Sequence, residues 1–339
     1  MGLSSIKKKH ENLIGLGDGI KGIVNNRNFC YMNAFMQCLA PIEPLRDYYL
    51  TQVYAQFKEM STKRHSFDFV NSLYMFYKGM YRLKDPIIDL INLKDAVTKK
   101  FHPIQQHDSH EFMIYLLSSL QEEETPQDSY FNGSNERQSL QTIIDQYYSA
   151  HPSIIDKVFT GIQKTIVICG KCTQKSITYN PFMTLSLEFD ASLEKSMMRF
   201  LSDDQLSSSE QYRCDKCKKP SKAKIQTELS KLPDVLTFHL KRFTYPIPKK
   251  IKGKCKYPPH LNMAEFCPEA SEIDDSLKYE LFGVTVHLGS LEMGHYIAYT
   301  KRFDSWYLFN DEHHHKVTES EALNQEVYLL FYRRMNQSV

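Results

Sequence analysis

The sequence predicts an α+β protein, in which a helical first part faces a β-rich second part. Up to about residue 123, apolar residues recur at helical spacing. From about residue 155 onward, segments rich in β-branched and aromatic residues alternate with turn residues. With 339 residues, of which 42% are hydrophobic, the chain can bury a large core without disulfides or metals.

Helices are expected over residues 30–40, 69–81 and 108–120. In the first, Met32, Phe35, Met36 and Leu39 share one face, and a proline at position 41 ends the pattern. Residues 1–19 are polar and contain glycine, which is typical of a flexible lead-in. Within residues 124–150, a polar run from 124 to 138 indicates a loop.

The β-rich part is expected to form an antiparallel sheet, because many of its segments alternate in polarity. The expected strands cover residues 158–168, 176–189, 222–229, 235–243, 279–287, 295–302, 306–310 and 327–333.

Charge and hydropathy leave the partner class open. Lys and Arg total 42 and Asp and Glu total 40, so the net charge of +2 argues neither for nor against nucleic acid. No apolar run approaches the roughly 18 residues of a membrane span, and Lys7–Lys9 are not followed by the apolar core of a signal peptide. We therefore expect a protein of the nucleus, the cytoplasm or both, with reduced thiols and no membrane contact.

Cys30 is the candidate nucleophile. It lies at the start of the first predicted helix, where free N–H groups and partial positive charge favour a thiolate. A buried cysteine acting as a small hydrophobe, as expected for Cys38, is the competing interpretation for any single thiol. Cys30 therefore needs a basic partner.

His295 is that partner. The glycine-bearing stretch 288–294 delivers it at the start of a predicted strand, where a base can be held at fixed distance from its nucleophile. The next predicted strand ends in Asn310 and Asp311, which could orient the imidazole ring. The competing interpretation is that this Asn-Asp pair only begins a turn.

Four cysteines form a candidate metal site. Cys169 and Cys172 form one C-x-x-C pair, and Cys214 and Cys217 form another. Two such pairs can supply four thiolates to one tetrahedral Zn²⁺, which would be structural because no ligand position stays open. A redox C-x-x-C is disfavoured by the two copies in β-rich sequence.

Five segments resemble, in the same order, the sequence boxes of the ubiquitin-specific proteases. They are residues 22–37 around Cys30, 106–112, 232–243, 294–311 around His295, and 328–332. Together they extend over nearly the whole chain, and five matches in order are far more specific than one.

The resemblance implies a papain-like fold with a helical thumb (about residues 20–150), zinc-bearing fingers (about 158–232) and a β-rich palm (about 233–334). Residues 20–334 would then be one catalytic domain. It implies a thiol deubiquitinase that hydrolyses the bond after the C-terminal glycine of ubiquitin. Asn25 would donate to the oxyanion. Asp108 and Glu111 would bind the ubiquitin tail, and we assign Gly294 to the same substrate-binding set. Ubiquitin and ubiquitinated proteins are the expected partners, and direct binding to nucleic acid is not expected.

The cysteine box departs from the family at two positions. Arg27 replaces a glycine and Phe29 replaces a threonine. If that glycine has a positive φ, arginine there would be strained. This would favour an impaired ubiquitin-binding scaffold, or an enzyme activated by a partner. Residues 155–161, 180–187 and 291–296 are similar to the branch that acts in the SAGA coactivator complex, which makes a histone deubiquitinase a further alternative. A zinc-dependent nucleic-acid-binding module is a third, although it leaves the His295 segment unexplained.

Overall fold

The computed structural model describes residues 15–51, 68–125, 131, 133, 138–202, 204–205, 212–244, 246–247, 249–267, 277–290 and 293–335. The first 14 residues of the predicted flexible lead-in lie outside this set. Its last residues make defined contacts: the N–H of Gly17 donates to Tyr81 O at 2.7 Å, and Arg302 Nε donates to Gly19 O at 2.9 Å. This end of the lead-in is therefore fixed to residues of both the helical and the β-rich part.

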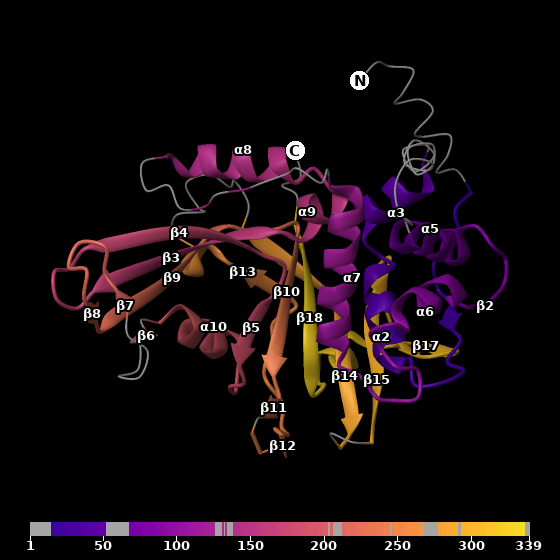
Figure 1. The fold of residues 1–339 in the computed structure, drawn as a ribbon. Helices are drawn as coiled ribbons and strands as arrows, with labels where there is room; N and C mark the ends of the chain where they lie inside the picture. Colours follow the sequence, from indigo (N-terminus) through magenta and orange to yellow (C-terminus); the bar gives the residue numbers. More distant parts are fainter. Residues whose placement is uncertain are drawn as a thin grey trace.

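Five helices gather on one side of a large sheet (Figure 1), namely α2 (Cys30–Leu39), α3 (Glu43–Leu50), α5 (Asp68–Tyr81), α6 (Ile91–Val97) and α7 (Ser109–Glu124). Further helical elements are α8 (Leu140–Ala150), α9 (Ile154–Phe159), α10 (Leu193–Leu201), η2 (Ala264–Phe266) and α11 (Glu319–Leu323). The three predicted helices correspond to α2, α5 and α7. α9 differs from expectation, since it occupies the start of the strand predicted from residue 158. α8 follows the polar run 124–138 that was predicted to be a loop, in residues for which no element was predicted.

The large sheet has the order β17-β16-β15-β14-β18-β10-β5, and β13 pairs with β14. Its strands are β5 (Leu185–Glu188), β10 (Val235–Lys241), β13 (His260–Asn262), β14 (Lys278–Gly289), β15 (Gly294–Arg302), β16 (Ser305–Asn310), β17 (His313–Val317) and β18 (Val327–Arg334). All of its neighbouring pairs are antiparallel except β5 with β10. β5 falls within the range predicted for the fingers, yet it belongs to this sheet.

A second, four-stranded sheet of order β4-β3-β9-β6 extends away from the first (Figure 1). It contains β3 (Gly161–Cys169), β4 (Lys175–Phe182), β6 (Asp204–Gln205) and β9 (Ala223–Lys231), and its far end is joined by the hairpin β7 (Tyr212–Arg213) and β8 (Pro220–Ser221). α8 packs on it through a separate small core that includes Ile143, Tyr147 and Ile162. The remaining short ladders are β1 (Gly22–Ile23) with β2 (Ile87–Ile88) and β11 (Phe243–Thr244) with β12 (Lys249–Lys250).

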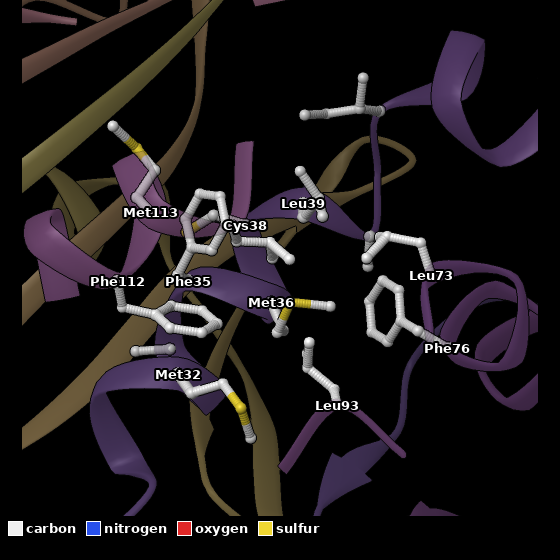
Figure 2. Close-up of a cluster of buried hydrophobic side chains, with 14 of the residues drawn as sticks. Met32, Phe35, Met36, Cys38, Leu39, Leu73, Phe76, Leu93, Phe112 and Met113 are labelled. Carbon is white, nitrogen blue, oxygen red and sulfur yellow. The ribbon is translucent and has the colours of Figure 1, made fainter. Parts of the chain in front are cut away.

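The core places α2 at the centre of the helical part. All ten residues of α2 are buried. Figure 2 shows Met32, Phe35 and Met36 among side chains of three neighbouring helices. These neighbours are Leu73 and Phe76 of α5, Leu93 of α6, and Phe112 and Met113 of α7. The packing fixes the helix whose first residue is Cys30.

Strand alternation gives the large sheet two buried faces. Tyr296 and Ala298 pack with the helices, whereas Ile297 and Tyr299 belong to the core on the opposite face. Both faces of β15 are therefore packed, which fixes the strand whose second residue is His295. In the part of the chain that the structure describes, no helix is both long and apolar enough to cross a membrane.

Candidate active site

Cys30 is the first residue of α2 and is 6% exposed. The residue before it, Phe29, occupies the N-cap position without a side-chain hydrogen bond to the helix. The first-turn N–H groups of α2 and their partial positive charge therefore lie beside the sulfur. The buried helix behind the sulfur fixes its position.

His295 is the second residue of β15 and lies beside Cys30 and Asn310. Its Nε2 is 2.7 Å from Asn310 Oδ1, which leaves Nδ1 as the nitrogen that serves the sulfur. The hydrogen bond with Cys30, helped by the one with Asn310 and opposed by burial, raises the pKa of His295 to about 9. The imidazole is thus protonated at neutral pH, which suits a thiolate–imidazolium pair.

Asp311 turns away from the Asn310 side chain, because its backbone has a φ of 51°. Its Oδ2 is 3.7 Å from His295 Nε2 and accepts a hydrogen bond from Asn25 Nδ2 at 2.8 Å. Its Oδ1 accepts one from Asn33 Nδ2 at 2.8 Å. Asp311 therefore joins the segment before the nucleophile to the loop after the base.

The side-chain amide of Asn25 is held at both ends. Its Oδ1 accepts from the N–H of Phe29 at 3.0 Å, while its Nδ2 donates to Asp311. Its own backbone N–H donates to Glu312 Oε1 at 2.6 Å. An amide Nδ2 carries two hydrogens, so one can serve Asp311 and the other can face an oxyanion formed at Cys30.

The predicted tail-binding residues lie at the start of α7 and of β15. Asp108 is the N-cap of α7: its Oδ1 accepts from the N–H groups of His110 and Glu111 at 2.7 and 2.9 Å, and its Oδ2 accepts from the Tyr328 hydroxyl. The exposed Glu111 carboxylate is 3.4 Å from Lys100 Nζ. Asp108 thus has a capping function that sequence reasoning did not assign.

Gly294 has no space for a side chain. A Cβ there would lie 2.0 Å from Nε2 of His287. Its backbone N–H donates to Gln106 Oε1 at 3.0 Å, and its carbonyl accepts from Gln106 Nε2 at 2.7 Å. Gln106 is the first residue of the second resembling segment, yet sequence reasoning gave it no function. Asn33 was also missed, although a polar side chain on the apolar helix α2 could have indicated a buried partner.

The departure at Arg27 causes no backbone strain. Among residues that the structure describes, the non-glycine residues with positive φ are Thr173, Lys218, Phe303 and Asp311. Arg27 is exposed and is not one of them. The strain hypothesis for Arg27 is therefore wrong. Phe29 is buried, with Lys94 Nζ 5.5 Å from its ring centroid.

The four candidate metal ligands lie together at the far end of the second sheet. The sulfurs of Cys169, Cys172, Cys214 and Cys217 all lie within 4.8 Å of one another, and those of Cys172 and Cys214 are 3.6 Å apart. Tetrahedral Zn–S bonds of about 2.3 Å require sulfurs about 3.8 Å apart, so the set fits such an ion. This cluster could hold a metal ion.

The two C-x-x-C pairs share one backbone conformation. Each is followed by a residue with positive φ, Thr173 at 56° and Lys218 at 53°. The N–H of each of these residues donates to the carbonyl of the first cysteine of its pair, at 3.0 and 2.7 Å. Two equivalent turns therefore present their sulfurs to one point, which is the arrangement that tetrahedral coordination needs.

Comparison with known families shows which family the chain belongs to. The family described as ubiquitin carboxyl-terminal hydrolase matches residues 21–332. The chain belongs to this family. It is 30% identical to ubiquitin carboxyl-terminal hydrolase 23 of Arabidopsis thaliana over 325 residues, and 29% identical to probable ubiquitin carboxyl-terminal hydrolase 16 of Schizosaccharomyces pombe over 330 residues. These matches cover 94% of this hydrolase-family chain in each case, but 36% and 67% of the relatives.

Solved structures agree with this family's fold. The SAGA DUB module Ubp8/Sgf11/Sus1/Sgf73 bound to ubiquitin aldehyde matches with a TM-score of 0.74 and 25% identity, over 95% of this chain and 71% of that one. The Ubp8-Sgf11-Sgf73-Sus1 SAGA DUB module matches with a TM-score of 0.71 and 25% identity, over 96% and 69%. The predicted mixed helix-and-sheet fold of the family is confirmed.

Proposed function

We propose that the chain is a thiol-dependent deubiquitinase that hydrolyses the peptide or isopeptide bond after the C-terminal glycine of ubiquitin. The observation that carries the proposal is the placement of His295 beside Cys30, the first residue of α2, with its Nε2 2.7 Å from Asn310 Oδ1. Family membership supports the substrate, and one structural neighbour is described as bound to ubiquitin aldehyde.

In the proposed reaction, the Cys30 thiolate attacks the glycine carbonyl and forms a tetrahedral intermediate. The second hydrogen of Asn25 Nδ2 stabilises the oxyanion, with Asp311 holding that amide in place. His295 gives its proton to the leaving amine as the C–N bond breaks, and a thioester remains on Cys30. His295 then takes a proton from water, which attacks the thioester and releases ubiquitin and the thiolate.

The ubiquitin tail is proposed to lie near Asp108, Glu111 and Gly294, where carboxylates suit arginine side chains. The four-cysteine cluster is proposed to hold one structural Zn²⁺, with Cys169, Cys172, Cys214 and Cys217 as ligands. The neighbouring SAGA modules support assembly into a coactivator-type complex. A nuclear or cytoplasmic location remains part of the same proposal.

Covalent labelling tests the proposal directly. Ubiquitin with a C-terminal electrophile should form an adduct with the purified protein, and Cys30→Ala should abolish the adduct while ubiquitin still binds. Cys38→Ala should still react, because burial raises the pKa of that thiol and removes it from chemistry. Labelling that persists in Cys30→Ala would show that another group is the nucleophile.

A further inference from the structure

His295 lies on a two-stranded arm that projects beyond the rest of the large sheet. The pairing of β14 with β18 stops at Val286, and that of β15 with β16 begins at Ala298. Beyond these points, residues 287–289 pair with residues 294–296 in the described strands. In Figure 1 this arm is the lower end of β14 and β15. Among the described residues, no strand pairs with the outer edges of this arm, so these edges carry backbone groups without a strand partner.

On the β14 edge, the side chain of Lys250 makes hydrogen bonds that a neighbouring strand would otherwise make. Its Nζ donates to His287 O at 2.6 Å and to Gly289 O at 3.0 Å. Residues two apart on a strand direct their carbonyls to the same edge, so one ammonium group serves both. Lys250 comes from β12, which is not part of the large sheet.

On the β15 edge, Gln106 has the corresponding position. Its carboxamide accepts from the N–H of Gly294 and donates to the Gly294 carbonyl, at 3.0 and 2.7 Å. This is the pair of bonds that a residue of an adjacent antiparallel strand would form. The bonded residue is the one directly before His295.

The segment that carries Gln106 is also bound to the nucleophile loop. The backbone N–H of Asn28 donates to Pro103 O at 3.3 Å, and the Asn28 side-chain amide donates to Ile104 O. Asn28 lies two residues before Cys30. One short segment therefore contacts the base side and the nucleophile side of the catalytic pair.

We propose that Gln106 and Lys250 are positioning residues, which hold His295 against Cys30 by replacing the strand partners that the arm lacks on its two edges. The proposal rests on the proposed function, in which His295 serves the Cys30 thiol. Neither side chain is placed among the reacting groups.

The test compares Gln106→Ala and Lys250→Met with matched neighbours, Gln105→Ala and Lys249→Met, whose side chains are exposed on the same two segments. Steady-state hydrolysis of a ubiquitin C-terminal fluorogenic amide gives kcat and KM. Iodoacetamide alkylation of Cys30, followed by mass spectrometry from pH 5 to 10, reports the catalytic pair without ubiquitin.

Loss of two hydrogen bonds at either edge should lower kcat about tenfold, with KM within about twofold. Alkylation of Cys30 at neutral pH should slow, and its alkaline limb should shift. Lys250→Arg keeps the charge and donors but not the compact ammonium geometry, so it should recover only part of the rate. The two neighbour variants should match the wild type, and all variants should show wild-type circular dichroism.

Two results would overturn the proposal. One is an unchanged kcat and alkylation profile in both Gln106→Ala and Lys250→Met. The other is a raised KM with an unchanged alkylation profile, which would place these side chains in substrate binding instead. If the wild type does not hydrolyse the ubiquitin substrate, the proposed function fails, but the alkylation comparison still decides this inference.

Discussion

Asn310 and Asp311 contact different partners because the chain turns between them. Asn310 faces the ring of His295, whereas Asp311 faces Asn25 and Asn33. Asn310→Ala should lower kcat about tenfold, since one hydrogen bond that orients the base is lost. Asn310→Asp should be tolerated, because a carboxylate oxygen can accept the same proton.

Asp311→Ala should also lower kcat, because it frees the oxyanion donor Asn25. Both alanine variants should be less impaired than His295→Ala when compared at saturating substrate. A silent Asn310→Ala together with an Asp311→Ala as severe as His295→Ala would reverse the two assignments.

The pH dependence follows from the raised pKa of His295. A pKa raised to about 9 means that the imidazolium is complete at neutral pH and is lost as pH rises through 9. The pH profile of the Cys30 alkylation rate should therefore change on its alkaline side near pH 9, where His295 loses its proton. In Asn310→Ala this change should move to lower pH, because the bond that helps to raise the pKa is absent. A profile that does not respond to Asn310→Ala would contradict this account of the shift.

At the scale of elements, the N-terminus of α7 combines capping with a predicted substrate contact. Asp108→Ala removes the acceptor for two helix N–H groups, so the free energy of unfolding should fall by about 1–2 kcal/mol in urea titrations. Asp108→Asn keeps an N-cap oxygen but loses the charge. It should unfold like the wild type yet raise KM for a ubiquitin substrate. An unchanged KM in Asp108→Asn would confine this residue to the helix cap.

Several elements could not be read from local sequence. α8 follows a polar run, and no helix was predicted for it. The helical spacing of Ile143, Ile144 and Tyr147 would nevertheless have indicated one. β17 begins with three histidines and has little intrinsic strand propensity. It forms because it pairs with β16 as the edge of the sheet. By contrast, α2 and the long strands β14, β15 and β18 were predictable, since each has a sustained apolar pattern.

The same limit applies to the site. Cys30 and His295 were predicted because five segments resemble a known family in the same order, and the four cysteines because their spacing is specific. Gln106 and Lys250 act through backbone groups that are distant in sequence, which no local pattern reports. That Arg27 has no positive φ could likewise be learned only from the backbone angles of the structure.

At the scale of the whole molecule, the four-cysteine cluster lies at the far end of the second sheet, whereas Cys30 and His295 lie on α2 and the large sheet. Cys172→Ser should remove the bound metal, detected by elemental analysis, and lower the melting temperature, because metal-site energy is largely folding energy. The KM for ubiquitin substrates should rise, so their hydrolysis should be less efficient. Alkylation of Cys30 should stay unchanged, because the large sheet and α2 do not depend on the cluster.

Lys171→Ala is the matched control, since Lys171 is exposed within the same turn and offers no ligand. It should keep the metal. Loss of Cys30 reactivity in Cys172→Ser would show that the two sheets fold as one unit.

The bonds from Ile23 and Asn25 to Asp311 and Glu312 join the two ends of the described chain. During synthesis the N-terminal part leaves the ribosome first, so Cys30 emerges long before its base has been translated. Contacts of such large sequence separation also form slowly. A nascent chain arrested before β15 should therefore carry an inert thiol, and it should not react with a ubiquitin electrophile. The order of translation thus keeps the thiol unreactive until β15 has been made.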